Sequence, residues 1–214
     1  MGHSSAARKA TQNMKIRFLT IMAASTLAAP FTPVMHGQDK PAVPALMKVD
    51  HNHSTIGFAV LILGGLSRVT GKFTDYDLAV VYDEIDITKS SINTTIRVTS
   101  IDTGIPDRDK DLRSAAFFDV EKYPVITFAS RSIEKKDSTR FIAHGTFTMK
   151  GVSREMDLPI SLSGQFENPA TKKLIFGFHT SMKLNRRDYG ITWEHQALAT
   201  FVGDEVAVEI DIIS

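Results

Sequence analysis

The chain has 214 residues with 25 Lys+Arg, 24 Asp+Glu and no cysteine, so disulfides and thiolate metal sites are excluded. Four of the basic residues precede residue 38, where there is no acidic residue, so residues 38–214 carry 21 basic and 24 acidic side chains, a net charge of −3. A mildly acidic chain without basic blocks argues against a nucleic-acid partner.

The N-terminal region has the composition of a secretory signal peptide. Lys15-Ile16-Arg17 precedes an apolar, alanine-rich run over 18–29, which is too short to span a bilayer. A membrane anchor and a disordered tail are the alternatives. We predict an N-terminal extension and signal peptide over 1–37, a proline-containing linker over 38–46 and a folded domain over 47–214. The mature protein is then periplasmic or secreted.

Most of the predicted domain alternates apolar and polar residues with a period of two, which is typical of β-strands. The strands are predicted at 56–62, 69–82, 92–98, 125–129, 141–149, 156–166, 174–184 and 206–212. Gly71 is expected to bend the long second strand. Lys150-Gly151 and the segment 167–171 predict turns.

One stretch breaks this alternation and predicts a short helix near 107–116. Asp107 can cap a helix after Pro106, and Asp109 suits its first turn. Leu112, Ala115 and Ala116 give one small apolar face. Phe117-Phe118 follows before an extended strand resumes, so the helix and the two phenylalanines are expected to cover one end of a β-structure.

Long antiparallel strands in meander order favour an all-β, up-and-down barrel, which leaves no exposed sheet edges. An eight-stranded barrel is wide enough to hold one small ligand or to be filled by side chains. A packed β-sandwich of the same composition remains the alternative.

Several spaced segments resemble the YceI-like family of periplasmic, lipocalin-like polyisoprenoid-binding proteins. They are Asp50-x-x-His53-Ser54-x-Ile56-x-Phe58-x-Val60, Val69-x-Gly71-x-Phe73, Ile101-Asp102-Thr103-Gly104-Ile105-x-x-Arg108-Asp109, Leu112-x-Ser114-x-x-Phe117-Phe118-Asp119-Val120-x-x-Tyr123-Pro124-x-Ile126-x-Phe128, Gly145-x-Phe147-x-Met149-Lys150-Gly151-Val152, Asn185-Arg186-x-Asp188-Tyr189-Gly190-Ile191-x-Trp193 and Val202-Gly203-Asp204-Glu205-Val206. The resemblance covers about 49–214. It implies an extended eight-stranded antiparallel lipocalin-like barrel whose pore holds a long isoprenoid chain.

The candidate ligand-binding residues divide into a pore lining and a pore mouth. The predicted lining is Phe58, Val60, Ile62, Phe73, Phe117, Phe118, Phe128, Phe147, Leu162 and Phe178, and the predicted mouth is His53, Arg108, Arg186 and Trp193. For each lining residue, ordinary core packing is the competing interpretation. Arg186 and Arg108 equally suit arginine–aspartate pairs that hold loops. Family members often carry a histidine where this chain has Ile62, a departure that makes the tube drier there.

No catalytic pattern stands out. The chain lacks a Gly-x-Ser-x-Gly elbow, a nucleophilic cysteine and a phosphate-binding glycine loop. His51 and His53 have a spacing that can bind a metal on one strand face, but no third ligand lies nearby, and a hydrogen-bonding role for His53 beside Ser54 is the simpler interpretation.

We therefore predict a non-enzymatic protein, without metal or cofactor, that binds a long-chain polyisoprenoid or related amphiphilic lipid (quinone-like or polyprenyl) for transport, storage or sequestration. A stress-related interaction protein with a packed barrel is the alternative, and a lipid-modifying enzyme the third hypothesis. Exposed aromatics at the barrel ends also raise the prospect of a homodimer.

Overall fold

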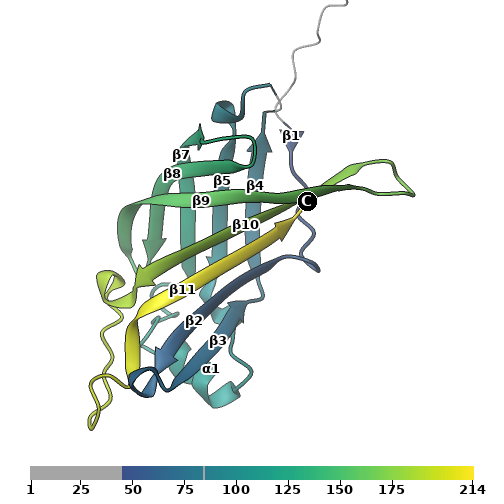
Figure 1. Cartoon of the computed structure of the whole chain (residues 1–214). Helices are drawn as coiled ribbons and strands as arrows, with labels where there is room; N and C mark the ends of the chain where they lie inside the picture. The colour runs from purple at the N-terminus through teal and green to yellow at the C-terminus, as the bar shows by residue number, and fades with distance from the viewer. Residues whose placement is uncertain (1–44, 84) are drawn as a thin grey trace, which may run out of the picture. The chain divides into compact units, whose positions relative to one another are not determined.

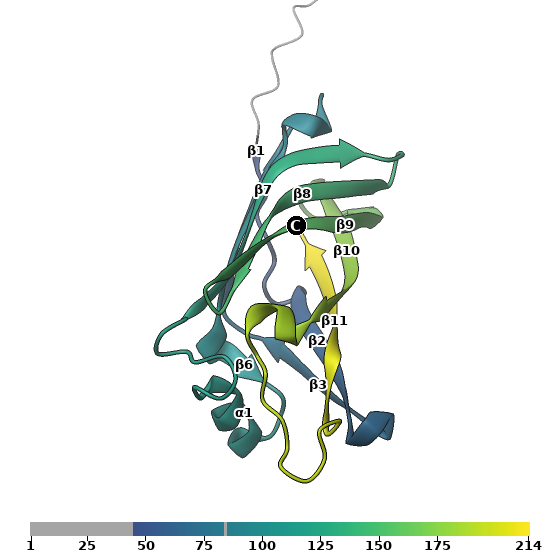
Figure 2. The same ribbon diagram turned by 90° about the vertical axis from the view of Figure 1, so that its left-hand side faces the viewer.

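The computed structural model describes residues 45–83 and 85–214, which form one antiparallel sheet of eleven strands (Figure 1). The strands are β1 (Ala45–Leu46), β2 (Thr55–Ile62), β3 (Ser67–Phe73), β4 (Tyr76–Tyr82), β5 (Ser91–Arg97), β6 (Ile101–Asp102), β7 (Val125–Lys135), β8 (Arg140–Met149), β9 (Val152–Glu167), β10 (Leu174–Asn185) and β11 (Val202–Ile213). Their order in the sheet is β1-β4-β5-β7-β8-β9-β10-β11-β2-β3-β6. The sheet curls around an interior (Figure 2), which confirms the predicted all-β, lipocalin-like class.

Short helices occupy the connections. They are η1 (Leu63–Gly65), η2 (Ile87–Lys89), η3 (Val98–Ser100), η4 (Arg186–Tyr189) and the single α-helix of the described residues, α1 (Pro106–Arg113). Across 45–83 and 85–214, no helix is both long and apolar enough to traverse a bilayer. The predicted signal peptide and nearly all of the predicted linker lie outside the described residues.

The segment predicted as one strand over 69–82 is two strands, which is why nine strands of seven or more residues occur where eight were expected. The chain breaks at Thr74-Asp75, between β3 and β4, and not at Gly71. Gly71 stays in the β2–β3 ladder opposite Phe58, where a Cβ atom would lie 2.4 Å from the Phe58 ring. Its role is therefore to admit that ring.

The break at Thr74-Asp75 also joins the two edges of the sheet. β3 pairs with β2 and β6, whereas β4 pairs with β1 and β5, so the consecutive strands β3 and β4 lie at opposite ends of the strand order. Here the Thr74 N–H donates to the Ser100 carbonyl at 3.2 Å, which continues the β3–β6 ladder, and the Arg97 N–H donates to the Asp75 carbonyl at 3.0 Å, which continues the β4–β5 ladder. The chain itself, and not a strand pairing, therefore joins the two sides of this seam.

Farther along β4, the segment leading into β2 crosses the same seam. The Met47 N–H donates to the Val80 carbonyl at 2.9 Å, and the Asp50 N–H donates to the Ile213 carbonyl at 2.8 Å. Residues 47–50 therefore link β4 to the end of β11. The described strand pairings include no direct ladder between these two strands.

A β-bulge interrupts β7 in the middle of the sheet. Ser130 pairs with Gly145 and Ser132 with His144, so Arg131 is an extra residue on β7. The Ser130 hydroxyl accepts a hydrogen bond from the Ile92 N–H at 2.8 Å, which replaces a ladder bond to β5. The bulge reverses which side chains of β7 face the interior from that point on.

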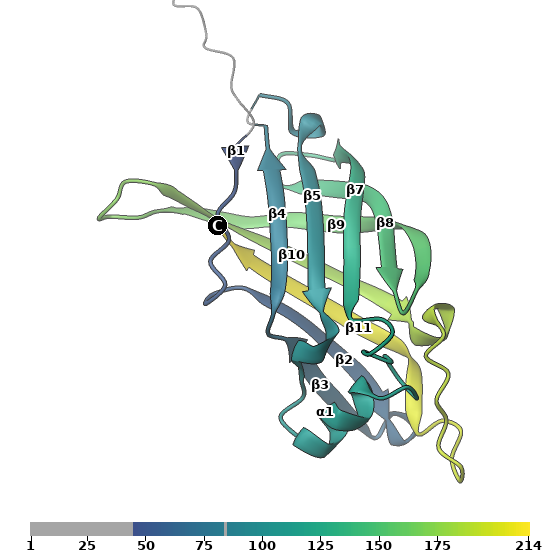
Figure 3. The same ribbon diagram turned by 180° about the vertical axis from the view of Figure 1, so that it is seen from behind.

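α1 lies at one end of the curled sheet, as expected, but with different boundaries (Figure 3). Pro106 is the first helical residue and Ile105 the cap, without a side-chain cap bond, so Asp107 does not cap the helix. The helix ends at Arg113, where the Ser114 hydroxyl bonds back to the Asp111 carbonyl at 2.6 Å. Ala115 and Ala116 therefore lie in the following turn and not on a helical face.

Candidate functional site: an apolar cavity inside the curled sheet

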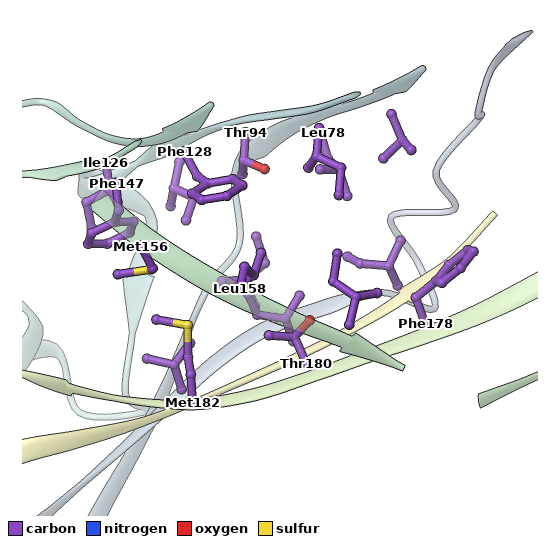
Figure 4. A pocket seen from close by; sticks show the side chains of 18 of the residues that line it. Leu78, Thr94, Ile126, Phe128, Phe147, Met156, Leu158, Phe178, Thr180 and Met182 are labelled. Atoms are coloured by element: carbon purple, nitrogen blue, oxygen red, sulfur yellow. The ribbon is translucent and has the colours of Figure 1, made fainter. Parts of the chain in front are cut away.

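The interior of the curled sheet contains a cavity of about 550 Å³. Side chains from strands on opposite sides converge on it (Figure 4), among them Phe128, Phe147, Met156, Phe178 and Met182. Alternation along each strand directs one face inward, so the apolar rows of the sequence become the lining. A volume of this size lies within the usual range of ligand pockets, roughly 300–1,000 Å³.

Nine of the ten predicted lining residues border this cavity. They are Phe58, Val60, Phe73, Phe117, Phe118, Phe128, Phe147, Leu162 and Phe178. Ile62, the last residue of β2, does not border it, although its ladder partner Val202 does. Contact of any of the ten with a ligand stays a prediction.

The two ends of the cavity differ in exposure. At the α1 end the lining residues Leu112, Phe117 and Phe118 are half-buried, and Met149 and Ile191 are buried. At the opposite end, which we call the open end, the lining includes exposed residues from the 83–90 and 136–139 loops and the last residue of β7. They are Ile85, Thr88, Lys135 and Ser138, with Asp86 half-buried beside them.

A cluster of aromatic rings closes the α1 end from outside. Phe117 stacks on Trp193 with ring centroids 5.2 Å apart, and Trp193 in turn contacts His195 and Phe201. Trp193, predicted at the pore mouth, does not border the cavity, because Phe117 stands between the two. The indole is therefore a second layer behind the cavity wall.

Arg186, also predicted at the mouth, borders the cavity but is fully engaged with the protein. Only 4% of it is exposed, and its guanidinium donates to four backbone carbonyls and pairs with Asp204 at 2.9 Å. The carbonyls belong to Ile191, Trp193, Val202 and Gly203. Burial lowers the pKa of Arg186, and the nearby Asp204 opposes that effect. The observed geometry matches the loop-holding interpretation.

Like Trp193, the predicted mouth residues Arg108 and His53 do not border the cavity. Arg108 donates to the Thr103 hydroxyl at 2.8 Å and to the Thr103 carbonyl at 2.9 Å, which ties α1 to the preceding loop. His53 lies in an exposed turn, where its Nδ1 bonds to Asp50 at 2.8 Å instead of to Ser54.

No metal site is evident in the described residues. His51 and His53 lie in a turn and not on a strand, so they do not share the face that the spacing suggested, and His51 packs against Tyr76. Over 45–83 and 85–214, no group of three potential metal-ligating side chains comes together.

The predicted site omitted several lining residues that the sequence pattern did signal. Met156, Leu158 and Ile160 alternate along β9 in the same row as Leu162, and Met182 and Leu184 continue the row of Phe178 along β10. The open-end residues were missed for a different reason. They lie in loops and beyond the β7 bulge, where no periodicity assigns a direction.

Comparison with known proteins agrees with this architecture. The model of the YceI-like domain matches residues 47–213. The YceI protein of Salmonella arizonae is 36% identical over 153 residues, which cover 71% of this chain and 78% of that protein. Two solved structures share the fold: Burkholderia cenocepacia BcnA (TM-score 0.68, 20% identity, 78% and 99% of the two chains covered) and a polyisoprenoid binding domain from Saccharophagus degradans (TM-score 0.57, 15% identity, 77% and 95% covered). The chain belongs to the YceI-like family.

Proposed function

We propose that this protein binds a long-chain isoprenoid or related amphiphilic lipid in its cavity and carries, stores or sequesters it without catalysing a reaction on it. The cavity of about 550 Å³ with a predominantly apolar lining is the observation that carries the proposal. The Saccharophagus degradans neighbour, described as a polyisoprenoid binding domain, supports it. With a cleaved signal peptide over 1–37, the site of action is the periplasm or the exterior.

Burial of hydrocarbon alone can supply the affinity. Each methylene group moved from water into an apolar pocket contributes about 0.8 kcal/mol, so an isoprenoid tail needs few polar contacts. The lining agrees with a small number of polar contacts, because the guanidinium of Arg186 is already bonded to backbone carbonyls and to Asp204. Binding that depends on tail burial tolerates different head groups.

Native mass spectrometry of the protein purified without detergent tests the proposal. We expect a discrete bound mass that extracts into organic solvent as a polyprenyl or quinone-like lipid. A protein that is free of ligand, and stays so after incubation with such lipids, would contradict it.

Three single variants locate the binding. Phe147→Asp and Phe178→Asp each place a carboxylate in the apolar lining, which should abolish lipid retention because burying an unpaired charge is costly. Phe166→Asp is the matched control, since Phe166 lies on β9, is 61% exposed and does not border the cavity. Circular dichroism confirms that each variant is folded. Full lipid content in folded Phe147→Asp and Phe178→Asp would place the lipid elsewhere.

A binding role for another protein, or for a second copy of this chain, is the alternative. The tip between β2 and β3 favours it, because Leu61, Leu63 and Leu66 are exposed there and Leu66 is 88% accessible. Sedimentation velocity of the wild type and of Leu66→Glu tests self-association. A monomer in both cases removes the homodimer from consideration.

A further inference from the structure

The direction in which an amphiphile lies in the cavity follows from the polar groups at its two ends. The α1 end is closed by apolar rings and by the saturated Arg186. The open end has exposed polar side chains among its lining residues, including Lys135 and Ser138. A lipid head group keeps its hydration only at the open end.

The β7 bulge determines which charge faces this end. Before the bulge Ile126 and Phe128 border the cavity, and after it Ile133 and Lys135 do. Without the extra residue Arg131, the alternation would turn Glu134 inward and Lys135 outward. The bulge therefore places a cation at the opening and directs a carboxylate to the outer surface.

The acidic side chains near Lys135 form hydrogen bonds or ion pairs with other residues. Glu134 bonds to His144 at 3.2 Å and to Lys136 at 2.6 Å on the outside of the sheet. At the opening, Asp86 accepts hydrogen bonds from both the N–H and the hydroxyl of Thr88. In contrast, the ammonium group of Lys135 has no hydrogen-bond or ion-pair partner among the residues that the structure describes.

We propose that Lys135 binds an acidic head group, a phosphate or a carboxylate, at the open end, while the tail extends toward Phe117 and Phe118 at the α1 end. This proposal rests on the lipid-binding function proposed above and adds its polarity and head-group class. An ammonium group is a suitable partner for either anion because it offers three donors and a full charge. Arg186, which was predicted at the pore mouth, lies at the other end of the cavity.

Matched ligands and variants test the head-group part. Affinities are measured for geranylgeraniol, geranylgeranyl phosphate and geranylgeranoic acid, which share one tail, with the wild type, Lys135→Gln and Lys136→Gln. We expect the wild type to prefer one or both anions over the alcohol by about fivefold or more, and Lys135→Gln to remove this preference while leaving the alcohol unchanged. Lys136→Gln is the control, because its ammonium group is paired with Glu134 outside the cavity.

The outcomes separate the two proposals. Equal binding of the alcohol and both anions by the wild type overturns the head-group proposal and leaves lipid binding intact. A preference that survives in Lys135→Gln also overturns it, and failure of all three ligands to bind overturns both. Comparison of the two anions tells whether a phosphate or a carboxylate is preferred.

The single tryptophan reports the orientation independently. Trp193 stacks on Phe117 at the α1 end, whereas Lys135 borders the open end. An isoprenoid analogue with a nitroxide at the tail terminus should quench Trp193 fluorescence more strongly than one with a nitroxide at the head. Stronger quenching by the head-labelled analogue would reverse the assigned orientation.

Discussion

Gly145 is the residue on which the β7 bulge depends. It lies opposite Ser130 in the β7–β8 ladder, and a Cβ atom there would be 2.4 Å from the Ala129 carbonyl oxygen and 2.9 Å from the Ser130 Cα. Both contacts are with backbone, which cannot move without undoing the bulge. A single hydrogen atom in place of a side chain thus permits the geometry that turns Lys135 toward the cavity.

Gly145→Ala is therefore expected to lower the free energy of unfolding by about 1–3 kcal/mol, the usual cost of overpacking. Urea denaturation measures the change. Gly177→Ala is the control, since its Cβ would meet the Ile213 side chain at an ordinary 3.5 Å. Equal stability of the two alanine variants would show that β7 can adapt to a side chain.

His144 links three strands on the outer surface and should make stability depend on pH. Its Nδ1 bonds to Asp157 at 2.7 Å and its Nε2 to Glu134 at 3.2 Å. The hydrogen bond to Asp157, then that to Glu134, raises the pKa of His144 above its ordinary value of 6.5. A group whose pKa is higher in the folded state stabilises the fold when protonated.

The stability contribution of His144 should be complete below about pH 6.5 and vanish as the pH rises through the folded pKa. The difference in unfolding free energy between the wild type and His144→Gln, measured across this range, should shrink as the pH increases. NMR titration of the ring gives the folded pKa directly. A difference that grows with pH would contradict the assigned cause.

At the scale of elements, the strand pattern was predicted from the sequence and its interruptions were not. Period-two alternation located the long strands, although it joined β3 and β4 into one, because each strand has one face against the interior. The break at Thr74-Asp75 was not predicted, although the inward apolar positions change there from odd to even numbers, from Phe73 to Leu78 and Val80. The prediction overlooked this change, which the pairing of β3 and β4 with different neighbours makes plain.

The alternation also explains which residues of the candidate site were predicted. Phe147 and Phe178 were assigned to the interior because they fall on the apolar face of their strands, and both border the cavity. Lys135 was missed because a bulge reverses parity and Ser130 carries no local sign of one. Arg186 was placed at a mouth by its neighbours in sequence, whereas its orientation is determined by carbonyls of the loop and of β11.

A polar network holds α1 in place, in addition to Leu112, which packs against the core. The Asp109 carboxylate, which is buried, accepts hydrogen bonds from the Thr103 N–H at 2.9 Å and from the Thr103 hydroxyl. Arg113 extends from the last turn of α1 to the carbonyls of Thr99 and Ile101, both at 2.8 Å. The helix is thereby attached to the segment before it at both of its ends.

Asp109→Ala should lower the free energy of unfolding by about 1–3 kcal/mol, because the Thr103 N–H loses its acceptor. Thermal denaturation followed by Trp193 fluorescence measures the loss. Asp107→Ala is the control, because Asp107 is exposed in the same first turn and contributes mainly through the helix dipole. An equal effect of the two variants would mean that the Asp109–Thr103 contact does not anchor α1.

At the scale of the whole domain, the cavity volume limits the length of tail that can be enclosed. Each isoprene unit adds five carbons, so binding should tighten about tenfold or more per unit while the tail still fits. Beyond about 550 Å³ of occupied space, further units emerge at the open end and add little. Dissociation constants for a series of C10, C15, C20 and C25 alcohols should fall and then level off.

A continuous decrease through the longest alcohol would indicate that the cavity expands or that the tail follows an outer groove. A flat series from the shortest member would indicate that only the head group is recognised. The same series with Phe147→Asp should show weak binding that does not tighten with length, because the carboxylate lies at the inner part of the cavity, away from Phe178 (Figure 4).

The seam between the two sheet edges has a further consequence for selectivity. A barrel closed by a full ladder has a fixed circumference, since widening it would break a whole strand pairing. Here no strand pairing among the described residues joins β1 or β4 to β3 or β6, and the chain itself passes between the two sides at 47–50, 74–75 and 98–100. We therefore expect the wall to widen at the seam without breaking a ladder, so that lipids of different width, from a slender polyene to a substituted ring, fit the same cavity.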